Sequence, residues 1–222
     1  MINGLEDYSK AKGGSKHLKR AIIRDYLAVE EDYNGFIKVL YEDIDEISYR
    51  FNKNPQYRSE DSEDRLNIEI ADALSLIGYT TNHDGMNGGH VDINVELGEH
   101  SWIGEAKIFR GNNTLLEGFL QLETRYRPGS GNWKHNQGGL LIYIQEGKNV
   151  QSIIDSWKTY LEAAYEERGV KLTFTACPNN IFACHSTHNH EVSGREFVVR
   201  HVPFILIHAP SDKSGRNRKG TQ

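Results

Sequence analysis

Apolar residues recur at helical spacing in the first quarter of the chain. They lie three or four residues apart within two groups. The first group is Leu18, Ile22 and Tyr26, and the second is Ile37, Leu40, Ile44 and Ile47. This spacing places side chains on one face of a helix. We therefore predict that residues 1–58 form a helical N-terminal extension, which serves as a cap or a dimerisation element. A polar connection, "NKNPQYRSEDSED", follows it.

The pattern after residue 58 alternates between helices and strands. A helix is expected to begin after Asp61 or Ser62 and to end at Gly78. Its apolar stripe consists of Leu66, Ile70, Ala73, Leu74 and Ile77. Further helices are predicted over residues 115–126 and 150–168. Strands are predicted over residues 91–97, 102–109, 139–145, 170–176 and 196–209, and Pro203 is expected to break the last of them.

This order of elements predicts an α/β fold with a central mixed β-sheet flanked by helices. The main domain is expected to span residues 59–210. A basic tail, residues 211–222, is expected to be disordered, because its composition offers nothing to bury.

Composition and charge narrow the functional classes. Of 222 residues, 37% are hydrophobic, and the net charge is −5. No apolar run approaches the length of a membrane span, and we see no secretory signal. Two cysteines do not make a disulfide framework. The sequence thus predicts a soluble, cytoplasmic protein without a membrane partner, and the charge argues against a wholly basic nucleic-acid binder.

Three charged residues interrupt the apolar pattern of the predicted hairpin "GHVDINVELGEHSWIGEAKIFRG". With a period of two, Asp92 lies on one face of the first strand, and Glu105 and Lys107 share a face of the second. If the apolar faces coincide, these three side chains converge. Two neighbouring carboxylates repel each other, and hard oxygen ligands suit Mg²⁺ or Mn²⁺. The hairpin therefore indicates a metal site.

The alternative interpretation is a solvated hairpin face with ordinary cross-strand ion pairs. The short pattern E-x-K is weak evidence alone, since it recurs at Glu146 and Lys148 without a preceding aspartate hairpin.

The order helix, strand with Asp92, strand with Glu105-x-Lys107, helix, strand resembles the core of the PD-(D/E)XK phosphodiesterase superfamily, the restriction-endonuclease-like fold. The resemblance covers residues 60–145, and Val91 stands where that family name has proline. It implies that Asp92 and Glu105 bind Mg²⁺ or Mn²⁺ and that Lys107 orients or activates the attacking water.

The same resemblance implies a metal-dependent endonuclease, with DNA as the expected substrate and a role in restriction, repair or antiviral defence. Many members of the family act as dimers, so we expect a homodimer. The alternative function is a non-catalytic nucleic-acid-binding subunit with the same fold. A structural protein built on the helices of residues 1–58 is a third possibility.

Members of this family often carry a further acid on the helix before the hairpin. Glu63 and Glu69 lie about 60° to either side of the apolar stripe, at 100° per residue. Glu63 is our choice for a metal ligand and Glu69 the second choice. The alternative is that Glu63 only complements the helix N-terminus.

The predicted helix "TLLEGFLQLETRY" has an apolar stripe of Leu115, Phe119, Leu122 and Tyr126. Its polar stripe contains Thr114, Gly118, Gln121 and Arg125. A glycine inside a helix costs about 1 kcal/mol of stability relative to alanine. Gly118 therefore suggests that another group packs closely against this face of the helix. By resemblance, Gln121 is assigned to the catalytic site. Gln121, Arg125 and Arg110 are predicted to contact nucleic acid.

A second group of residues could bind zinc: Cys177, Cys184, His185, His188 and His190. Their spacing matches no closed zinc module, and a structured hairpin loop is the favoured interpretation. His90, two residues before Asp92, could contact a substrate phosphate or be an ordinary loop residue.

Overall fold

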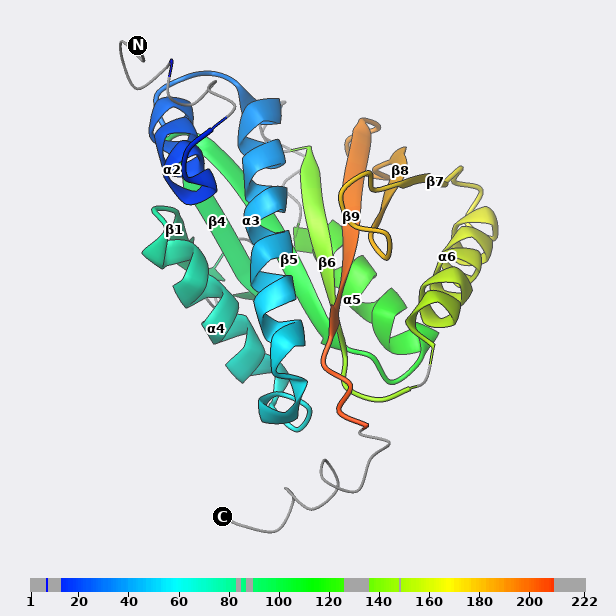
Figure 1. Ribbon diagram of the computed structural model, residues 1–222. Coiled ribbons are helices and arrows are strands. Elements are labelled where there is room, and N and C mark those ends of the chain that lie inside the picture. Colours follow the sequence, from blue (N-terminus) through cyan, green and yellow to red (C-terminus); the bar gives the residue numbers. More distant parts are fainter. Residues whose placement is uncertain are drawn as a thin grey trace.

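The computed structural model describes residue 7 and residues 13–82, 85–86, 90–125, 136–147 and 149–209 (Figure 1). Tyr126, Lys148 and the tail 211–222, on which parts of the sequence prediction rest, lie outside this part of the chain. The helical segments are α2 (Lys16–Leu27), α3 (Tyr33–Lys53), η1 (Pro55–Tyr57), α4 (Glu63–Leu76), α5 (Asn112–Arg125) and α6 (Val150–Glu166).

The strands are β1 (Thr80–Asn82), β2 (Gly85–Met86), β3 (His90–Val91), β4 (Ile93–Leu97), β5 (His100–Ile108), β6 (Gln137–Ile144), β7 (Thr173–Ala176), β8 (Cys184–Asn189) and β9 (Glu196–Ile205). Seven of them form one sheet in the order β1-β4-β5-β6-β9-β8-β7, while β2 and β3 form a separate pair. The β5–β6 and β6–β9 pairs are parallel and the others antiparallel. The predicted α/β fold with a mixed sheet is therefore confirmed.

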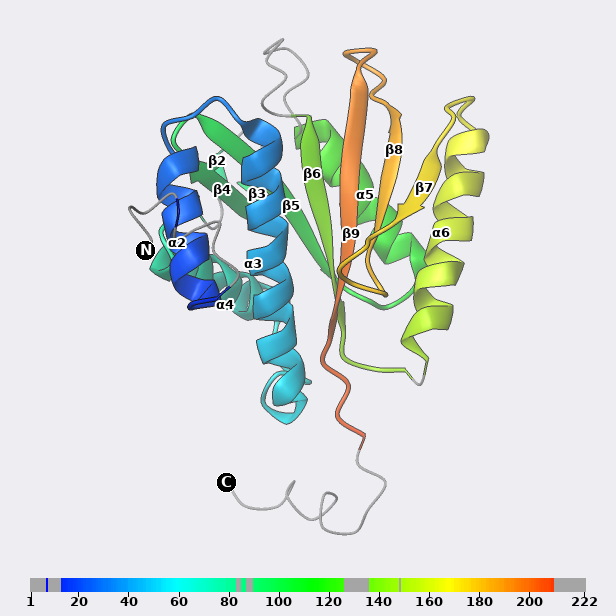
Figure 2. The same ribbon diagram turned by 45° about the horizontal axis from the view of Figure 1, so that its top comes forward.

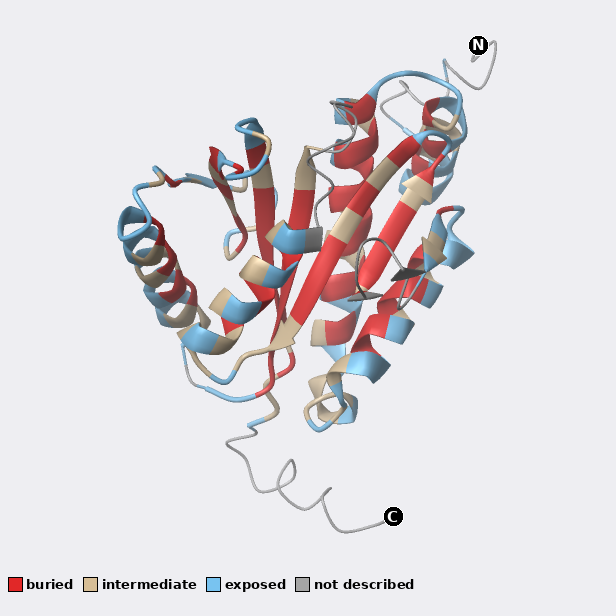
Figure 3. Ribbon diagram, turned by 180° about the vertical axis from the view of Figure 1, so that it is seen from behind, coloured by how far each residue is buried: buried red, intermediate tan, exposed pale blue. Residues whose placement is uncertain are grey.

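Helices cover both faces of the sheet (Figures 1 and 2). Apolar side chains of α3 and α4 pack on one face with those of β4. Side chains of α5 and α6 pack on the other face with those of β6 and β9. Seen from behind, the strands are largely buried, whereas α5 has exposed residues on its outer side (Figure 3). Since α3 shares its core with the sheet, the helices of residues 1–58 are part of the main hydrophobic core.

The apolar stripes predicted for α3 and α4 are largely confirmed. Leu40 and Ile44 are buried in α3, as are Leu66, Ile70 and Leu74 in α4. Ser62 is the N-cap of α4, and its hydroxyl oxygen accepts a hydrogen bond from Arg65 N at 3.3 Å. The helices thus begin and bury their faces where period and capping indicate.

The stripe predicted for α2 is wrong. Leu18 and Tyr26 are exposed, and the buried residues of this helix are Arg20, Arg24 and Leu27. The physical reason is the buried carboxylate of Asp43 on α3, which lies 3.0 Å from Arg20 Nη1 and 2.8 Å from Arg24 Nη1. A buried carboxylate needs a charged partner, so the arginines turn inward.

Two predictions for the last third of the chain are also wrong. Strand β9 continues through Pro203, which is in register with Ile142 of β6. Pairing with β8 ends at His201, so a residue without an N–H is tolerated beyond that point. The segment that carries Cys184, His185 and His188 is expected from the sequence to be a hairpin loop. It contains strand β8, in which buried side chains alternate with more exposed ones.

No helix in the described part of the chain has both the length and the apolar character needed to cross a membrane.

Candidate active site

The β4–β5 hairpin has the apolar face that alternation predicts. A two-residue turn of Gly98 and Glu99 joins the strands, and the register pairs Ile93 with Gly104 and Val95 with Trp102. Ile93, Val95, Leu97, Trp102 and Ala106 all belong to the core cluster beneath α3 and α4. The alternating residues Glu105 and Lys107 consequently point to the opposite side.

Strand β5 extends beyond its partner β4, and two carboxylates take the place of the missing strand. Strand β4 begins at Ile93, opposite Gly104, and Asp92 lies in a bend before it. Asp92 Oδ2 accepts a hydrogen bond from Ala106 N at 2.9 Å, and Glu63 Oε2 accepts one from Ile108 N at 2.8 Å. These bonds satisfy backbone donors of β5 and fix both acids beside Lys107.

Lys107 lies among three carboxylates. Its Nζ is 3.0 Å from Glu105 Oε1, 3.2 Å from Glu63 Oε1 and 3.5 Å from Asp92 Oδ2. Glu105 is buried, with 1% of its surface exposed, and the other acids are half-buried. Burial acts to lower the pKa of Lys107, but the three carboxylates outweigh it, and the net effect raises the pKa above its ordinary value. Lys107 is therefore a firmly held cation.

Glu63, rather than Glu69, is the acid of α4 that reaches this cluster. Glu69 forms an ion pair with Arg58, away from Lys107. Glu63 occupies the first turn of α4, as the helix-terminus interpretation requires, but its carboxylate is engaged by β5.

The close approach that Gly118 suggests comes from Lys107 itself. A Cβ at position 118 would lie 2.6 Å from Lys107 Cγ and 3.3 Å from Leu140 Cδ1. The absence of a side chain on this turn of α5 lets the lysine stem pass between the helix and the sheet. Gly118 thereby positions the ammonium.

A tyrosine and an asparagine that the sequence did not single out complete the surroundings. Tyr143 of β6 is fully buried, and its hydroxyl donates a hydrogen bond to Asn67 Oδ1 at 2.6 Å. Burial, together with the negative charges of Asp92 and Glu63, holds the pKa of Tyr143 well above its usual range. The sequence offers one signal for this contact, a tyrosine within an apolar strand. The hydroxyl group of a buried tyrosine needs a hydrogen-bond partner.

Two of the residues predicted to bind nucleic acid, Gln121 and Arg110, have exposed side chains. Gln121 is exposed on α5. Arg110 is exposed and its Nη1 lies 3.7 Å from Glu146 Oε1, so the second E-x-K supplies a surface ion pair. The side chains of Arg125 and His90 lie outside the described residues.

The five cysteine and histidine residues of the zinc alternative contact other side chains or the backbone, and two of them share Glu123. His188 and His190 both contact Glu123 of α5, and Cys177 Sγ lies 3.5 Å from Arg200 Nη2. His185 packs beside the ring of Tyr41, and Cys184 is buried in the other core cluster. Across the residues that can be described, no group of three or more His, Cys, Asp or Glu side chains is placed to hold a metal ion.

Comparisons with known protein families, curated proteins and solved structures found no match for this chain. The residues of the site are therefore the basis for any functional assignment.

Proposed function

We propose that this protein is a metal-dependent nuclease with a restriction-endonuclease-like core, which hydrolyses phosphodiester bonds in DNA. One observation carries the proposal: the carboxylates of Glu63, Asp92 and Glu105 converge on Lys107 from a helix, a bend and a strand. Three acids around one ammonium leave excess negative charge in a partly buried place. A hard divalent cation is the natural counter-ion for such oxygen ligands.

The donor set fits Mg²⁺ or Mn²⁺ in chemistry. Asp92 and Glu105 would hold the ion, with Glu63 as a further ligand, directly or through water. The ammonium of Lys107 now contacts the oxygens that an ion would use, so loading the site requires these side chains to rearrange. When bound, the ion would lower the pKa of a water molecule and offset charge on the phosphate.

Lys107 would serve the reaction through its proton donors. In the metal-free site the three carboxylates raise its pKa, and as an ammonium it can donate hydrogen bonds to a water or to a phosphate oxygen. The stem is confined by α5, which limits where the ammonium can lie. Its proposed role is to orient the attacking water and to stabilise negative charge on the phosphate.

The alternative function is a nucleic-acid-binding subunit without turnover. The hydrogen bonds from Ala106 N to Asp92 and from Ile108 N to Glu63 favour it, because they give both acids a structural purpose. The absence of a ready-made metal group among the described residues points the same way. Both functions share the fold and differ in chemistry.

A cleavage assay decides between them. The purified protein is incubated with plasmid, linear duplex, single-stranded DNA and RNA, with Mg²⁺ and then with excess EDTA. We expect cleavage of DNA that EDTA abolishes. Binding of DNA without cleavage in Mg²⁺ or Mn²⁺ would support the alternative. Retention of activity in EDTA would exclude metal dependence. Light scattering on the same sample tests the expected homodimer.

A further inference from the structure

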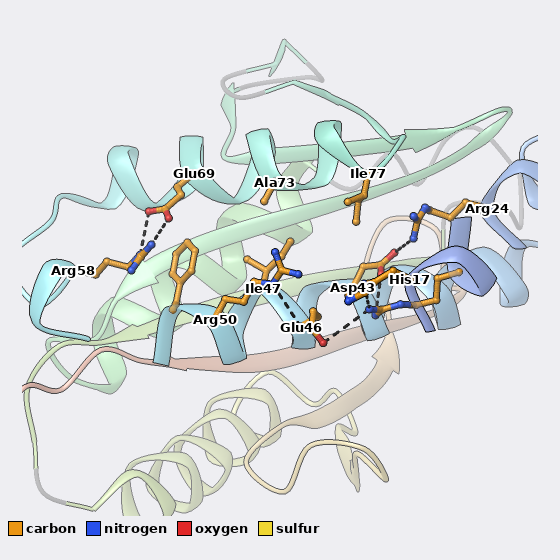
Figure 4. Close-up of a pocket in the computed structure, with 12 residues that line it drawn as sticks. His17, Arg24, Asp43, Glu46, Ile47, Arg50, Arg58, Glu69, Ala73 and Ile77 are labelled. Carbon is orange, nitrogen blue, oxygen red and sulfur yellow. Dashed lines mark hydrogen bonds and ion pairs between the residues drawn. The ribbon is translucent and has the colours of Figure 1, made fainter. Parts of the chain in front are cut away.

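A pocket of about 280 Å³ lies between α2, α3 and α4, and Glu63 does not line it. Figure 4 shows it as a groove between α3 and α4, with Arg24, His17 and Asp43 toward one end and Arg58 and Glu69 at the other. We call it the α2–α3–α4 pocket. Its volume lies just below the range of roughly 300–1,000 Å³ that is usual for small-molecule sites.

The pocket is positively charged although the protein is acidic. Four arginines line it against three carboxylates. At the α2 end the excess positive charge is buried. There the buried side chains of Arg20 and Arg24 both pair with the single carboxylate of Asp43. The nearest other acid, Glu46, lies 3.9 Å from Arg20 Nη2. Two buried guanidinium groups with one close carboxylate leave a site for an anion.

Arg24, one of the residues that line the pocket, also has an unused hydrogen-bond donor. The residue is 7% exposed, and its Nε is buried without a hydrogen-bond partner in the described structure. A buried donor left unpaired costs about 1–3 kcal/mol. Guanidinium groups bind phosphate oxygens through paired N–H donors, so a phosphate group matches this end of the pocket.

The middle of the pocket is apolar. Ile47 of α3 and Ala73 of α4 face each other there, with Ile77 nearby (Figure 4). Arg50 lies at the exposed rim, with 63% of its side chain accessible, and pairs with Glu46 at 3.5 Å. A ligand with phosphate at one end and an apolar or ring portion beside it fits this distribution.

We propose that the α2–α3–α4 pocket binds a small phosphorylated ligand of the nucleotide class. The phosphate contacts Arg20 and Arg24, Arg50 closes over it from the rim, and the ring portion lies against Ile47 and Ala73. The site is separate from the proposed metal site and does not depend on it.

Calorimetric titration of the full chain tests this proposal, with pyrophosphate, AMP and ATP as probes in resin-treated, metal-free buffer. Without metal, the acidic cluster repels these anions, so the pocket is measured alone. We expect one saturable ATP site per chain, and weaker binding of pyrophosphate because it lacks a ring. Arg24→Gln and Arg50→Gln should each weaken ATP binding about tenfold.

Arg65→Gln is the matched control, because Arg65 lies on α4 with 72% of its side chain exposed and is not part of the pocket lining. It should bind ATP within about twofold of the parent. Glu105→Gln should also bind ATP, which separates failure of this proposal from failure of the nuclease assignment. If Arg24→Gln does not fold, the rim variant Arg50→Gln decides. No saturable binding at about 1 mM ATP, pyrophosphate as tight as ATP, or equal losses in Arg65→Gln would overturn the proposal.

Discussion

Glu63 uses one carboxylate oxygen for the N–H of Ile108 and the other for Lys107. Asp92 likewise serves both the N–H of Ala106 and the ammonium. Each acid therefore has a structural role and a charge role. An amide of the same shape can still accept the backbone hydrogen bond, but it removes the charge. Such substitutions separate folding from chemistry at the scale of single residues.

Asp92→Asn and Glu105→Gln should lower the rate of metal-dependent DNA cleavage by on the order of a hundredfold or more, because each removes a carboxylate that we propose binds the metal. Cleavage rates at saturating Mg²⁺ measure the effect, and circular dichroism checks that both variants fold. Glu146→Gln is the control, since Glu146 is 84% exposed in the surface ion pair with Arg110. It should stay within a few-fold of the parent. Parental activity of Glu105→Gln would refute the nuclease assignment.

Lys107→Met should stop turnover while leaving metal binding intact, because an ammonium is not a metal ligand. Without it, the three carboxylates repel one another, so the metal-free variant should melt below the parent. Added Mg²⁺ should then raise the melting temperature of Lys107→Met more than that of the parent. Thermal unfolding with and without Mg²⁺ provides the measurement. No shift with Mg²⁺ in either protein would mean that the acids do not form a metal site.

At the scale of elements, the sequence predicts what depends on local period and misses what depends on partners. The stripes of α3 and α4 and the β4–β5 hairpin follow from spacing alone, and Asp92, Glu105 and Lys107 could be brought together on that basis. The inward arginines of α2 depend on Asp43, and the tolerance of Pro203 depends on where β8 ends. The contact between Tyr143 and Asn67 joins residues 76 positions apart, so no local pattern reveals it.

Helix α5 positions Lys107 through Gly118, and this relation can be tested. Gly118→Ala should gain up to about 1 kcal/mol in helix propensity. Its methyl group would nevertheless displace the lysine stem, because the added Cβ would lie 2.6 Å from Lys107 Cγ. We expect near-parental stability in urea unfolding and a cleavage rate reduced by about tenfold or more, since small misplacements are costly in catalysis. Glu117→Ala, at an exposed position of the same helix, should change neither.

Helix α6 is tied to the sheet by a buried histidine. Trp157 Nε1 donates a hydrogen bond to His201 Nδ1 at 3.1 Å, and His201 Nε2 lies 2.8 Å from Ser186 Oγ. Burial, with smaller contributions from His185 and His188, lowers the pKa of His201 to about 3. Below about pH 6.5 the unfolded chain takes up a proton on this residue that the folded chain does not. Stability contributed by His201 is therefore complete above that pH and is lost as the pH falls.

The free energy of unfolding should decrease from pH 7 to pH 5, by up to about 1.4 kcal/mol per pH unit for one proton. His185, whose pKa is also lowered by burial, acts in the same direction. Burial acts to raise the pKa of Glu123, but the hydrogen bonds from His188 and Tyr165 outweigh it, and the net effect lowers the pKa. The contribution of Glu123 to stability is therefore lost only at more acidic pH. In urea titrations, His201→Gln should flatten the dependence of the free energy of unfolding on pH. Ser186→Ala should lower the free energy of unfolding but leave its dependence on pH unchanged. A slope unchanged in His201→Gln would contradict the assignment.

At the scale of the whole molecule, one sheet separates two cores, and the helices before residue 58 complete one of them. Phe36 and Leu40 of α3 are fully buried, and Ile44 is 1% exposed. Loss of one such side chain costs about 2–5 kcal/mol, whereas a whole domain is stable by only about 5–15 kcal/mol. Removing α3 would also expose the face of β4 and β5 that carries Ile93, Val95 and Trp102.

We therefore expect that a chain of residues 59–222 does not fold on its own, although periodicity alone allows a boundary after residue 58. Its circular dichroism should show no cooperative thermal transition, and it should not cleave DNA. A chain of residues 13–222 is the control, because it retains α2 and α3 entire and should melt cooperatively like the parent. The two chains show whether folding fails because α3 is missing from the core or because the N-terminus has been shortened. Cooperative melting or metal-dependent cleavage by the 59–222 chain would instead make the first 58 residues a dispensable extension.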